Sequence, residues 1–586
     1  MKYIGFIIAA IFLWMGVVSC EDQYLEKPIG DDLVVDSVFA SKQRAMNAIA
    51  QVYQGSLASG LPVLSWDTNR RYGMTSGTIS HLSGEVNALK FNWEDAWRIQ
   101  RSGMTADDGS GRPRSDDGFN FNYIAIRRCF LVIDNIDKVP DMSDTEKREV
   151  KAEMKTLIAY RYQEMFKRYG GVPIVKGTLT VEDDILIPRA SLEDLLEHVV
   201  ALCDEAIPDL PDSYADRDKG RVTKGVAMAI KAEVLMYAAR PLFNSPTPYL
   251  SLGEHDNLIS FGRTDRTLWE RAVRASLDVL EWAENNNHYI INTGSPFDDY
   301  GTAVATPGNV EVLLAYKNQR SGGNTQGTSQ WFDPREEAGG ANAMSFNMLT
   351  QYYKADGTDQ VWPTSSTPYI DYQSRIEEME PRYKVSAMGA GIDAWNNPGS
   401  TYWTSRVITD GSTNEGRAGT EACGRRVKFW YMAGNRKWFE YPIYRLAEFY
   451  LNLAEAYNEL DNPQKSLEYL NEIRDRAGLN DITETNKDNL RRIIQREWAV
   501  EFYEEGHRFF AVKHWRHPDL GNGIIGGSKK SLVYTYQNGN FGYVAADYVS
   551  YSVETVYEGF WNPSQYLTPF PIAEVNKGYL IQNPGY

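Results

Sequence analysis

The chain has 586 residues, 42% hydrophobic and 24% charged, so it is long enough to bury a large core in two or more domains. Its formal net charge of −17 argues against nucleic acid as a partner, because phosphates require a basic face, and against adsorption to anionic lipid through a basic patch. Neutral or cationic ligands fit this charge better, although net charge says little about a single pocket.

The first feature along the chain is a short apolar segment, residues 4–18, which follows Lys2 and stops just before Cys20. It is too short for a comfortable membrane span but suits the hydrophobic region of a signal peptide. The run "VVSC" resembles the bacterial lipobox, in which cleavage precedes a cysteine that then carries lipid. Glu21 and Asp22 resemble the acidic cluster that follows this cysteine in surface-exposed lipoproteins of Bacteroidetes-type bacteria.

Two other roles for Cys20, half of a disulfide and a buried thiol, are weaker. Cys129 and Cys203 lie inside apolar helical patterns, which predicts buried thiols. With Cys423 they leave three cysteines that cannot all pair, and no Cys/His spacing suggests zinc. We therefore interpret residues 1–19 as a lipoprotein signal peptide and Cys20 as an anchor that several acyl chains hold in the membrane.

Residues 20–250 form the expected N-terminal helical half. A tether, residues 20–40, leads into a first helical segment, and residues 60–118 form a long irregular excursion rich in Gly, Ser, Thr, Asn and Trp. Helices are then predicted in "FNYIAIRRCFLVIDNID", "TEKREVKAEMKTLIAYRYQEMFKRYGG", "SLEDLLEHVVALCDEAI" and "TKGVAMAIKAEVLMYAAR". Ser191 is the expected N-cap of the third helix, and glycine ends the second.

Residues 270–586 form the expected C-terminal half. After the helix "LWERAVRASLDVLEWAENNN", a variable lobe of about residues 290–435 begins with a strand, "NVEVLLAYKNQ", and continues in Gly/Pro/Trp-rich loops. Helices return at about residues 440–517, in "RLAEFYLNLAEAYNEL", "PQKSLEYLNEIRDRAGL" and "NLRRIIQREWAVEFYEEGHRFFAVKHW", before a C-terminal tail. Paired amphipathic helices predict a mostly α fold, a helical scaffold with tetratricopeptide-like helix pairs and a large irregular loop-rich lobe.

The sequence contains no recognisable catalytic set: GxSxG, P-loop and HExxH motifs are absent. His507, His514 and His517 are better explained by a packed helix with a basic end than by a metal site, and "ADDGSGRPRSDDG" by a solvated loop than by a cation site. No cofactor and no metal site is predicted, and the sequence leaves open whether a structural cation sits in the loops.

Glycoside hydrolysis needs two carboxylates, and four glutamates, Glu497, Glu501, Glu504 and Glu505, are expected along one helix. Their spacing is better explained by a charged helix face whose glutamates pair with nearby arginines such as Arg496 and Arg508. This points to binding without catalysis.

Seven segments carry recognisable motifs: "KRYGGVPIV", "GRVTKGVAMAIKAEVLMYAARPLFN", "EPRYKVS", "YRLAEFYLNLAEAYNEL", "LNEIRDRAGL", "IIQREWAVEFYEEGHRFFAVKHW" and "YLTPFPIAEVNKGYLIQNPGY". Together they resemble the SusD/RagB family of outer-membrane nutrient-binding lipoproteins. Glu380 and Tyr383 depart mildly from the family's Asp-Pro-Arg-Phe segment. The resemblance implies a helical fold with four tetratricopeptide-like units, no catalysis, and a position on the cell surface over a SusC-like TonB-dependent transporter. It implies a glycan ligand, or peptides as in some branches of the family.

Ligand contacts are expected on aromatic rings in the two irregular regions, because an indole or phenol face can stack on the C–H face of a sugar. The chain has 36 Tyr and 15 Trp against 22 Phe. The candidate residues are Trp66, Asp67, Arg70, Tyr72, Trp93, Trp331, Trp362, Trp395 and Trp403. Trp269, Trp430, Trp498 and Trp515 are assigned to packing.

Three hypotheses follow. The first is a cell-surface glycan-binding lipoprotein that captures oligo- or polysaccharide for a partner transporter. The second is a peptide-binding member of the same family, which would use backbone hydrogen bonds and small apolar pockets. The third is a carbohydrate-active enzyme with acids hidden in the loop lobe. The tryptophans of the loops favour the first.

Overall fold

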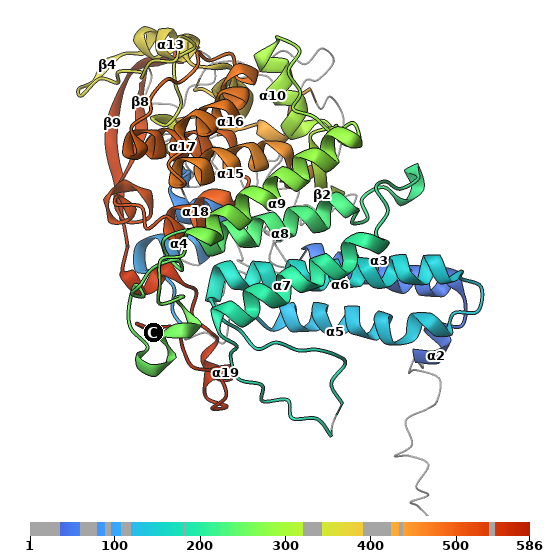
Figure 1. The fold of residues 1–586 in the computed structure, drawn as a ribbon. Helices are drawn as coiled ribbons and strands as arrows, with labels where there is room; N and C mark the ends of the chain where they lie inside the picture. Colours follow the sequence, from blue (N-terminus) through green and yellow to red (C-terminus); the bar gives the residue numbers. More distant parts are fainter. Residues whose placement is uncertain are drawn as a thin grey trace, which may run out of the picture.

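The computed structural model describes residues 35–58, 79–87, 95–106, 119–180, 182–319, 343–390, 423–432, 438–537 and 545–586. Helices dominate these residues, and most of the strands are short (Figure 1). The predicted mostly helical fold with a loop-rich lobe is therefore confirmed. Among the described residues no helix has both the length and the apolar character needed to cross a membrane.

The N-terminal half is a stack of helices in which neighbours in sequence pack against each other. The helices are α2 (Val35–Val38), α3 (Lys42–Ala58), α4 (Asp95–Ser102), α5 (Phe119–Asn135), α6 (Asp144–Tyr169), α7 (Leu192–Ala206), α8 (Lys224–Ala239) and α9 (Arg266–Asn285). Contacts join α5 to α6, α6 to α7, α7 to α8 and α8 to α9, and Figure 1 shows these helices side by side. This packing of successive helices produces the helix pairs expected of tetratricopeptide-like units.

Local sequence signals set the ends of these helices. Ser143 and Glu146 form a capping box at the start of α6, and Gly170 ends that helix at a φ of +75°, which favours glycine. The Ser191 hydroxyl accepts the Asp194 backbone N–H at the start of α7, as predicted. These caps satisfy backbone groups that a helix leaves without partners at its ends.

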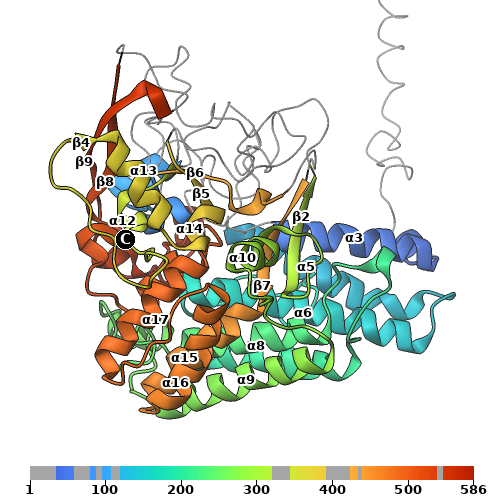
Figure 2. The ribbon, with the colours of Figure 1, turned by 90° about the horizontal axis from the view of Figure 1, so that it is seen from above.

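The C-terminal half extends the helical layer and adds the lobe. Its helices are α10 (Pro296–Ala305), α12 (Phe346–Leu349), α13 (Tyr369–Glu378), α14 (Pro381–Ser386), α15 (Leu446–Glu459), α16 (Pro463–Arg476), α17 (Lys487–Glu501), α18 (His507–His514) and α19 (Ile572–Val575). α15 packs against α9, α16 and α17, so the two halves share one layer (Figure 2).

The sequence predicted one continuous helix up to residue 515, and this is wrong. α17 ends at Glu501 and α18 begins at His507. Between them Glu504 and Gly506 have φ values of +64° and +80°, in the left-handed region that interrupts a right-handed helix. Glu504 and Glu505 therefore lie in a turn, off the face that carries Glu497 and Glu501.

All strand pairs in the described sheets are antiparallel. β2 (Val312–Gln319) is the predicted strand and pairs with β7 (Trp438–Arg445). A small sheet joins β1 (Val86–Asn87), β3 (Ala343–Met344), β6 (Arg425–Arg426) and β5 (Ala387–Met388). A third joins β4 (Thr367–Pro368), β9 (Tyr548–Gly559) and β8 (Gly527–Tyr536). The long β8–β9 pair falls where the sequence interpretation had only a tail.

Two main hydrophobic cores hold the described residues together, besides two small clusters. The larger lies between the helices, and the smaller lies beneath β8 and β9 and is built largely from tyrosines of the lobe. Cys129, Cys203 and Cys423 are buried free thiols, as predicted for the first two, and burial raises the pKa of Cys129 to about 12.

The C-terminal tail is fastened to the first helical half by side-chain amides. Asn583 Nδ2 donates to the backbone oxygens of Tyr169 and Thr568, at 3.1 and 2.8 Å. Gln582 donates to and accepts from the Phe570 backbone, at 2.8 Å each. The segment "KRYGG" and the final residues of the chain thus form one structural unit.

Candidate functional site

Most of the predicted ligand-contact residues lie outside the described residues. These are Trp66, Asp67, Arg70, Tyr72, Trp93, Trp331, Trp395 and Trp403, and Cys20 lies outside as well. Their proposed roles stay predictions. Trp269, Trp430, Trp498 and Trp515 are buried, which confirms their assignment to packing.

Trp362 is the predicted ligand aromatic that the structure places. Its half-buried indole packs edge-on against Phe346, with ring centroids 5.8 Å apart and an interplanar angle of 75°. The indole Nε1–H is buried and has no hydrogen-bond partner among the described residues. Trp362 therefore contributes to the smaller core, and its ligand contact remains a prediction.

The four glutamates of the expected charged face are buried, and their partners differ from those predicted. Glu497 and Glu501 receive ion pairs from Arg382, which approaches from α14. The Arg496 guanidinium instead pairs with Asp359, at 2.6 Å. The prediction that Arg496 and Arg508 form ion pairs with these glutamates is therefore wrong, because segments distant in sequence supply the buried cations.

The buried charges form a balanced network in which five acids face five bases. The acids are Glu311, Glu380, Glu497, Glu501 and Glu505, and the bases are Arg382, Lys428, Arg445, Arg474 and Arg476. Burial opposes ionisation of Glu501, but the guanidiniums of Arg476, Arg445 and Arg382 outweigh it and hold its pKa below the ordinary value. These carboxylates therefore have a structural role, joining the segments that carry the arginines and the lysine.

The buried histidines are likewise part of the packing. His514 Nε2 lies 2.9 Å from the Lys167 backbone oxygen, and burial lowers the pKa of His514 well below its ordinary value. A second group, Glu233, Glu448 and His507, has ligand atoms within 4.8 Å of one another. Lys167 Nζ already pairs with Glu233, at 3.2 Å. Burial raises the pKa of Glu448 and lowers that of His507, so both tend to be uncharged and suit a packed polar cluster.

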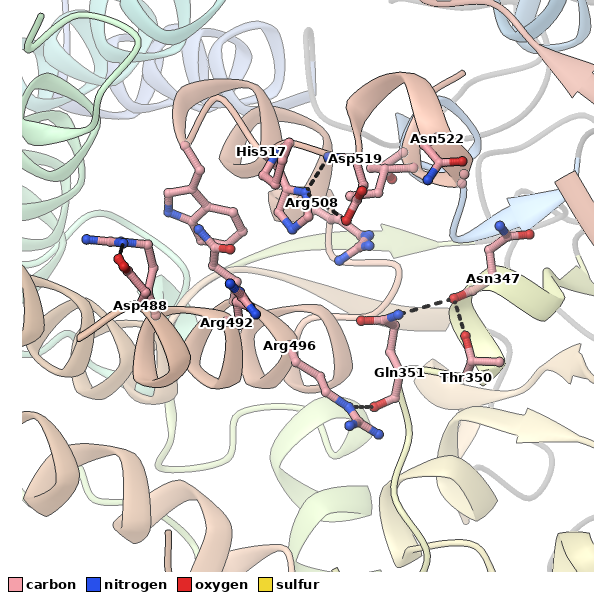
Figure 3. Close-up of a pocket in the computed structure, with 18 of the residues that line it drawn as sticks. Asn347, Thr350, Gln351, Asp488, Arg492, Arg496, Arg508, His517, Asp519 and Asn522 are labelled. Atoms are coloured by element: carbon pink, nitrogen blue, oxygen red, sulfur yellow. Dashed lines mark hydrogen bonds and ion pairs between the residues drawn. The ribbon is translucent and has the colours of Figure 1, made fainter. Parts of the chain in front are cut away.

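A polar pocket of about 810 Å³ lies where α17, the turn after α18 and α12 meet. Its volume falls in the range of small-molecule sites, about 300–1,000 Å³. Figure 3 shows Arg492 on the α17 side, Asn347 and Thr350 on the α12 side, and Asn522 in the turn. The residues that line it include Arg491, Arg492, Gln495, Arg496, Arg508, Trp515, His517, Asp519 and Asn522.

One wall of this pocket is a glycine-rich turn held against the neighbouring segment. Gly523 has a φ of +103°, and a Cβ on Gly84 would lie 2.4 Å from the Ile524 backbone oxygen. Lys529 Nζ donates to the Gly523 and Ile524 backbone oxygens. The wall therefore needs glycine for its close approach, and its carbonyl groups are occupied by a lysine.

The charged residues of the pocket divide into paired and unpaired groups. Arg491 bridges Glu459 and Asp488. Arg496 donates to the Gln351 backbone oxygen at 2.7 Å, besides pairing with an aspartate. Arg492 and Arg508 have no ion pair or hydrogen-bond partner among the described residues.

The pocket offers guanidinium and amide donors and hydroxyls, the chemistry that hydrogen-bonds the edges of a sugar. Sequence reasoning missed this site because its members come from separate segments. The available signal was the "RR" pair of α17 and the glycine-rich "LGNGIIGG" turn. Sequence reasoning treated the arginines of this region only as partners for nearby glutamates.

Comparison with known proteins gives a consistent assignment. A family model described as "SusD family" matches residues 310–586, and one described as "Starch-binding associating with outer membrane" matches residues 57–236. SusD-like protein P25 of Formosa agariphila is 20% identical over 527 residues, covering 87% of this chain and 89% of its own. SusD-like protein P38 of the same organism is 23% identical over 410 residues, covering 66% and 70%.

Solved structures share the fold. A SusD-like protein from Bacteroides fragilis superposes with a TM-score of 0.72 at 21% identity, covering 96% of this chain and 100% of the other. A second protein from that species, described as a SusD-like carbohydrate binding protein, has a TM-score of 0.65 at 19% identity, covering 93% and 99%. With two family models matching separate parts of the sequence and the same fold along nearly all of it, this chain belongs to the SusD/RagB family.

Proposed function

We propose that this protein is a cell-surface glycan-binding lipoprotein that captures oligo- or polysaccharide and delivers it to a SusC-like TonB-dependent transporter. The observation that carries the proposal is the family match along both halves of the chain, one part of which is described as starch-binding and associated with the outer membrane. A related fold described as carbohydrate binding supports the same ligand class.

The anchor is the lipid carried by Cys20. The apolar segment 4–18, the run "VVSC" and the acids Glu21 and Asp22 support cleavage before Cys20 and export to the surface of the outer membrane. Several acyl chains on one residue give firm membrane attachment.

Glycan capture rests on flat rings and polar edges. In the proposed site, tryptophans of the two irregular regions stack on sugar faces, and Asp67 and Arg70 bind hydroxyl groups. The pocket beside α17 adds amide and guanidinium donors from Asn347, Asn522 and Arg508. Because each contact is modest, affinity depends on a scaffold that holds the contacts in place before the ligand arrives.

The proposed protein makes and breaks no bond. Glu497 and Glu501 are 0% exposed and are held in ion pairs, so a glycoside cannot reach them. A general acid for glycoside cleavage needs a raised pKa, whereas the pKa of Glu501 is held below its ordinary value. This argues against Glu497 and Glu501 as the catalytic carboxylate pair of a glycoside hydrolase.

Peptide binding is the second candidate function. It would rely on backbone hydrogen bonds and small apolar pockets, whereas the irregular regions of this chain are rich in tryptophan. Peptides are therefore included as competitors in the test.

The test is a glycan panel applied to the chain from residue 21 onward, with isothermal titration as the readout. At least one glycan should bind saturably. Trp66→Ala, Trp331→Ala and Trp395→Ala should each weaken that binding about tenfold, which corresponds to about 1.4 kcal/mol. Tyr289→Ala is the matched control, because Tyr289 is an aromatic with 58% exposure outside the proposed site. Saturable binding of peptides and of no glycan would favour the second candidate.

A further inference from the structure

The pocket beside α17 contains an arginine without a counter-charge. Arg508, on α18, is half-buried, and no ion pair or hydrogen bond joins it to any described residue. Figure 3 shows its side chain entering the space between α17 and the turn that carries Asp519 and Asn522. An arginine keeps its charge at neutral pH, and a partly desolvated charge is costly without a partner.

The charged and titratable groups around Arg508 do not neutralise it. Glu85 is the acid whose charge attracts Arg508. The Glu85 carboxylate, however, already accepts hydrogen bonds from the Ser83 hydroxyl and the Glu504 backbone N–H. Burial raises the pKa of Glu85 to about 7, so it is only partly ionised at neutral pH. Lys529 donates to the Gly523 and Ile524 backbone oxygens of the glycine-rich wall, and burial lowers the pKa of its amine to about 7.

The remaining groups leave the centre of the pocket positive. His517 is neutral at pH 7, because burial and then Arg508 lower its pKa to about 4. Asp519 is 56% exposed and lies 3.9 Å from His517 Nδ1. On the opposite wall Arg492 is exposed and unpaired among the described residues. Two guanidiniums thus line the same pocket from α17 and α18, while two of the pocket's carboxylates, Glu459 and Asp488, are already paired with Arg491.

We propose that this pocket binds the anionic group, a sulfate ester or a carboxylate, of an acidic glycan. Guanidinium donors match the paired oxygens of such groups, and charge-assisted hydrogen bonds are stronger than neutral ones. Asn347, Gln495 and Asn522 line the same pocket and bind the sugar hydroxyls beside the anion. The inference rests on the proposed glycan-binding function and names its ligand class.

The overall charge of the chain makes this site selective. A protein with a net charge of −17 repels polyanions in general, so an acidic glycan gains only where positive charge is concentrated. The pocket supplies it through Arg492 and Arg508, the lining arginines that no ion pair joins to a described residue, although the net charge alone favours neutral or cationic ligands. Binding of the acidic glycan should weaken as ionic strength rises, because exposed Arg492 is screened by salt.

The test compares matched ligands at constant ionic strength by isothermal titration. The probes are a sulfated galactan oligosaccharide and its desulfated form, an oligogalacturonate and its methyl ester, and inorganic sulfate. We expect the sulfated galactan or the oligogalacturonate to bind at least tenfold tighter than its own neutral form. Arg508→Gln should weaken binding of the acidic glycan about tenfold or more and weaken any binding of the neutral form much less, because the neutral form offers Arg508 no charged oxygen.

Two further variants keep the result interpretable. Arg492→Gln changes an exposed side chain, so it should fold normally and still weaken the anionic ligand several-fold. Arg263→Gln, at an exposed arginine paired with Glu193 outside the pocket, is the matched control and should change nothing. Thermal unfolding of each variant verifies that it is folded.

The inference and the proposed function fail in different ways. Equal affinity for anionic and neutral partners, or unchanged binding by both pocket variants, overturns the inference and leaves glycan binding intact. Binding of inorganic sulfate as tightly as any acidic glycan also overturns it, because the site would then hold a free ion. If no glycan in either panel binds, the proposed function itself is wrong.

Discussion

The buried charge network gives a direct test of how the scaffold is held together. Glu501 accepts from Arg382, Arg445 and Arg476, and every charged side chain in these pairs is at most 1% exposed. Glu501→Gln keeps the shape but removes the negative charge. Five acids facing five bases then become four facing five, which leaves one buried positive charge uncompensated.

Breaking a buried ion pair by removing one partner costs about 3–5 kcal/mol, because the remaining charge stays desolvated. Arg476 is the most affected base, since its other carboxylate, Glu311, is shared with Arg445. The double variant Glu501→Gln/Arg476→Met restores the balance of charge. It should therefore lose less stability than the sum of the two single variants.

The assay is urea unfolding followed by far-UV circular dichroism under identical conditions. The matched control is Glu468→Gln, the same chemical change in an ion pair with Lys465 whose side chains are 53% and 48% exposed. Its effect should stay below about 0.5 kcal/mol. If Glu501→Gln unfolds at the same urea concentration as this control, the network does not stabilise the fold as argued.

Three other predictions concern packing, acid stability and the anchor. In Gly225→Ala the new Cβ would lie 2.2 Å from the Trp282 ring, so the free energy of unfolding measured in urea should fall by about 1–3 kcal/mol. Gly177→Ala is the control and should leave this free energy nearly unchanged, because no atom lies within 4 Å of its new Cβ. Burial lowers the pKa of His514, so below pH 6.5 the unfolded chain binds a proton that the native state does not bind, and acid destabilises the fold. The thermal midpoint should therefore fall less from pH 7.5 to 5.5 in His514→Gln than in the wild type. Equal falls in the two proteins would contradict this. Cys20→Ser should abolish palmitate labelling and release the protein from washed membranes, and an unchanged membrane fraction would contradict the anchor.

The helices were predictable because their signals are local. Serine caps, glycine ends and apolar stripes lie within the segments that they define, as at Ser191 and Gly170. The break between α17 and α18 has a weaker signal, a single Gly506, and the flanking periodicity hid it. The β8–β9 pair was not predicted, although "SLVYTY" and "YVSYSVETVY" are rich in the β-branched and aromatic residues that favour strands.

The site was harder to predict because its geometry depends on contacts between distant segments. Sequence spacing placed Arg496 and Arg508 beside glutamates of their own region. In the structure Glu501 instead forms ion pairs with Arg382, Arg445 and Arg476. Each of these arginines belongs to a different motif among those that resemble the family. Those motifs therefore encode the buried network, and the arginines that the network does not use are the ones that line the pocket.

The most direct test of the account combines binding with analysis of the bound sugar. Purified protein from residue 21 onward is saturated with its best glycan, the complex is isolated, and the glycan is recovered and sized by mass spectrometry. The account predicts stoichiometric, saturable binding and recovery of glycan of unchanged length after prolonged incubation. Recovery of shortened sugars, or failure of every glycan to bind, would contradict it.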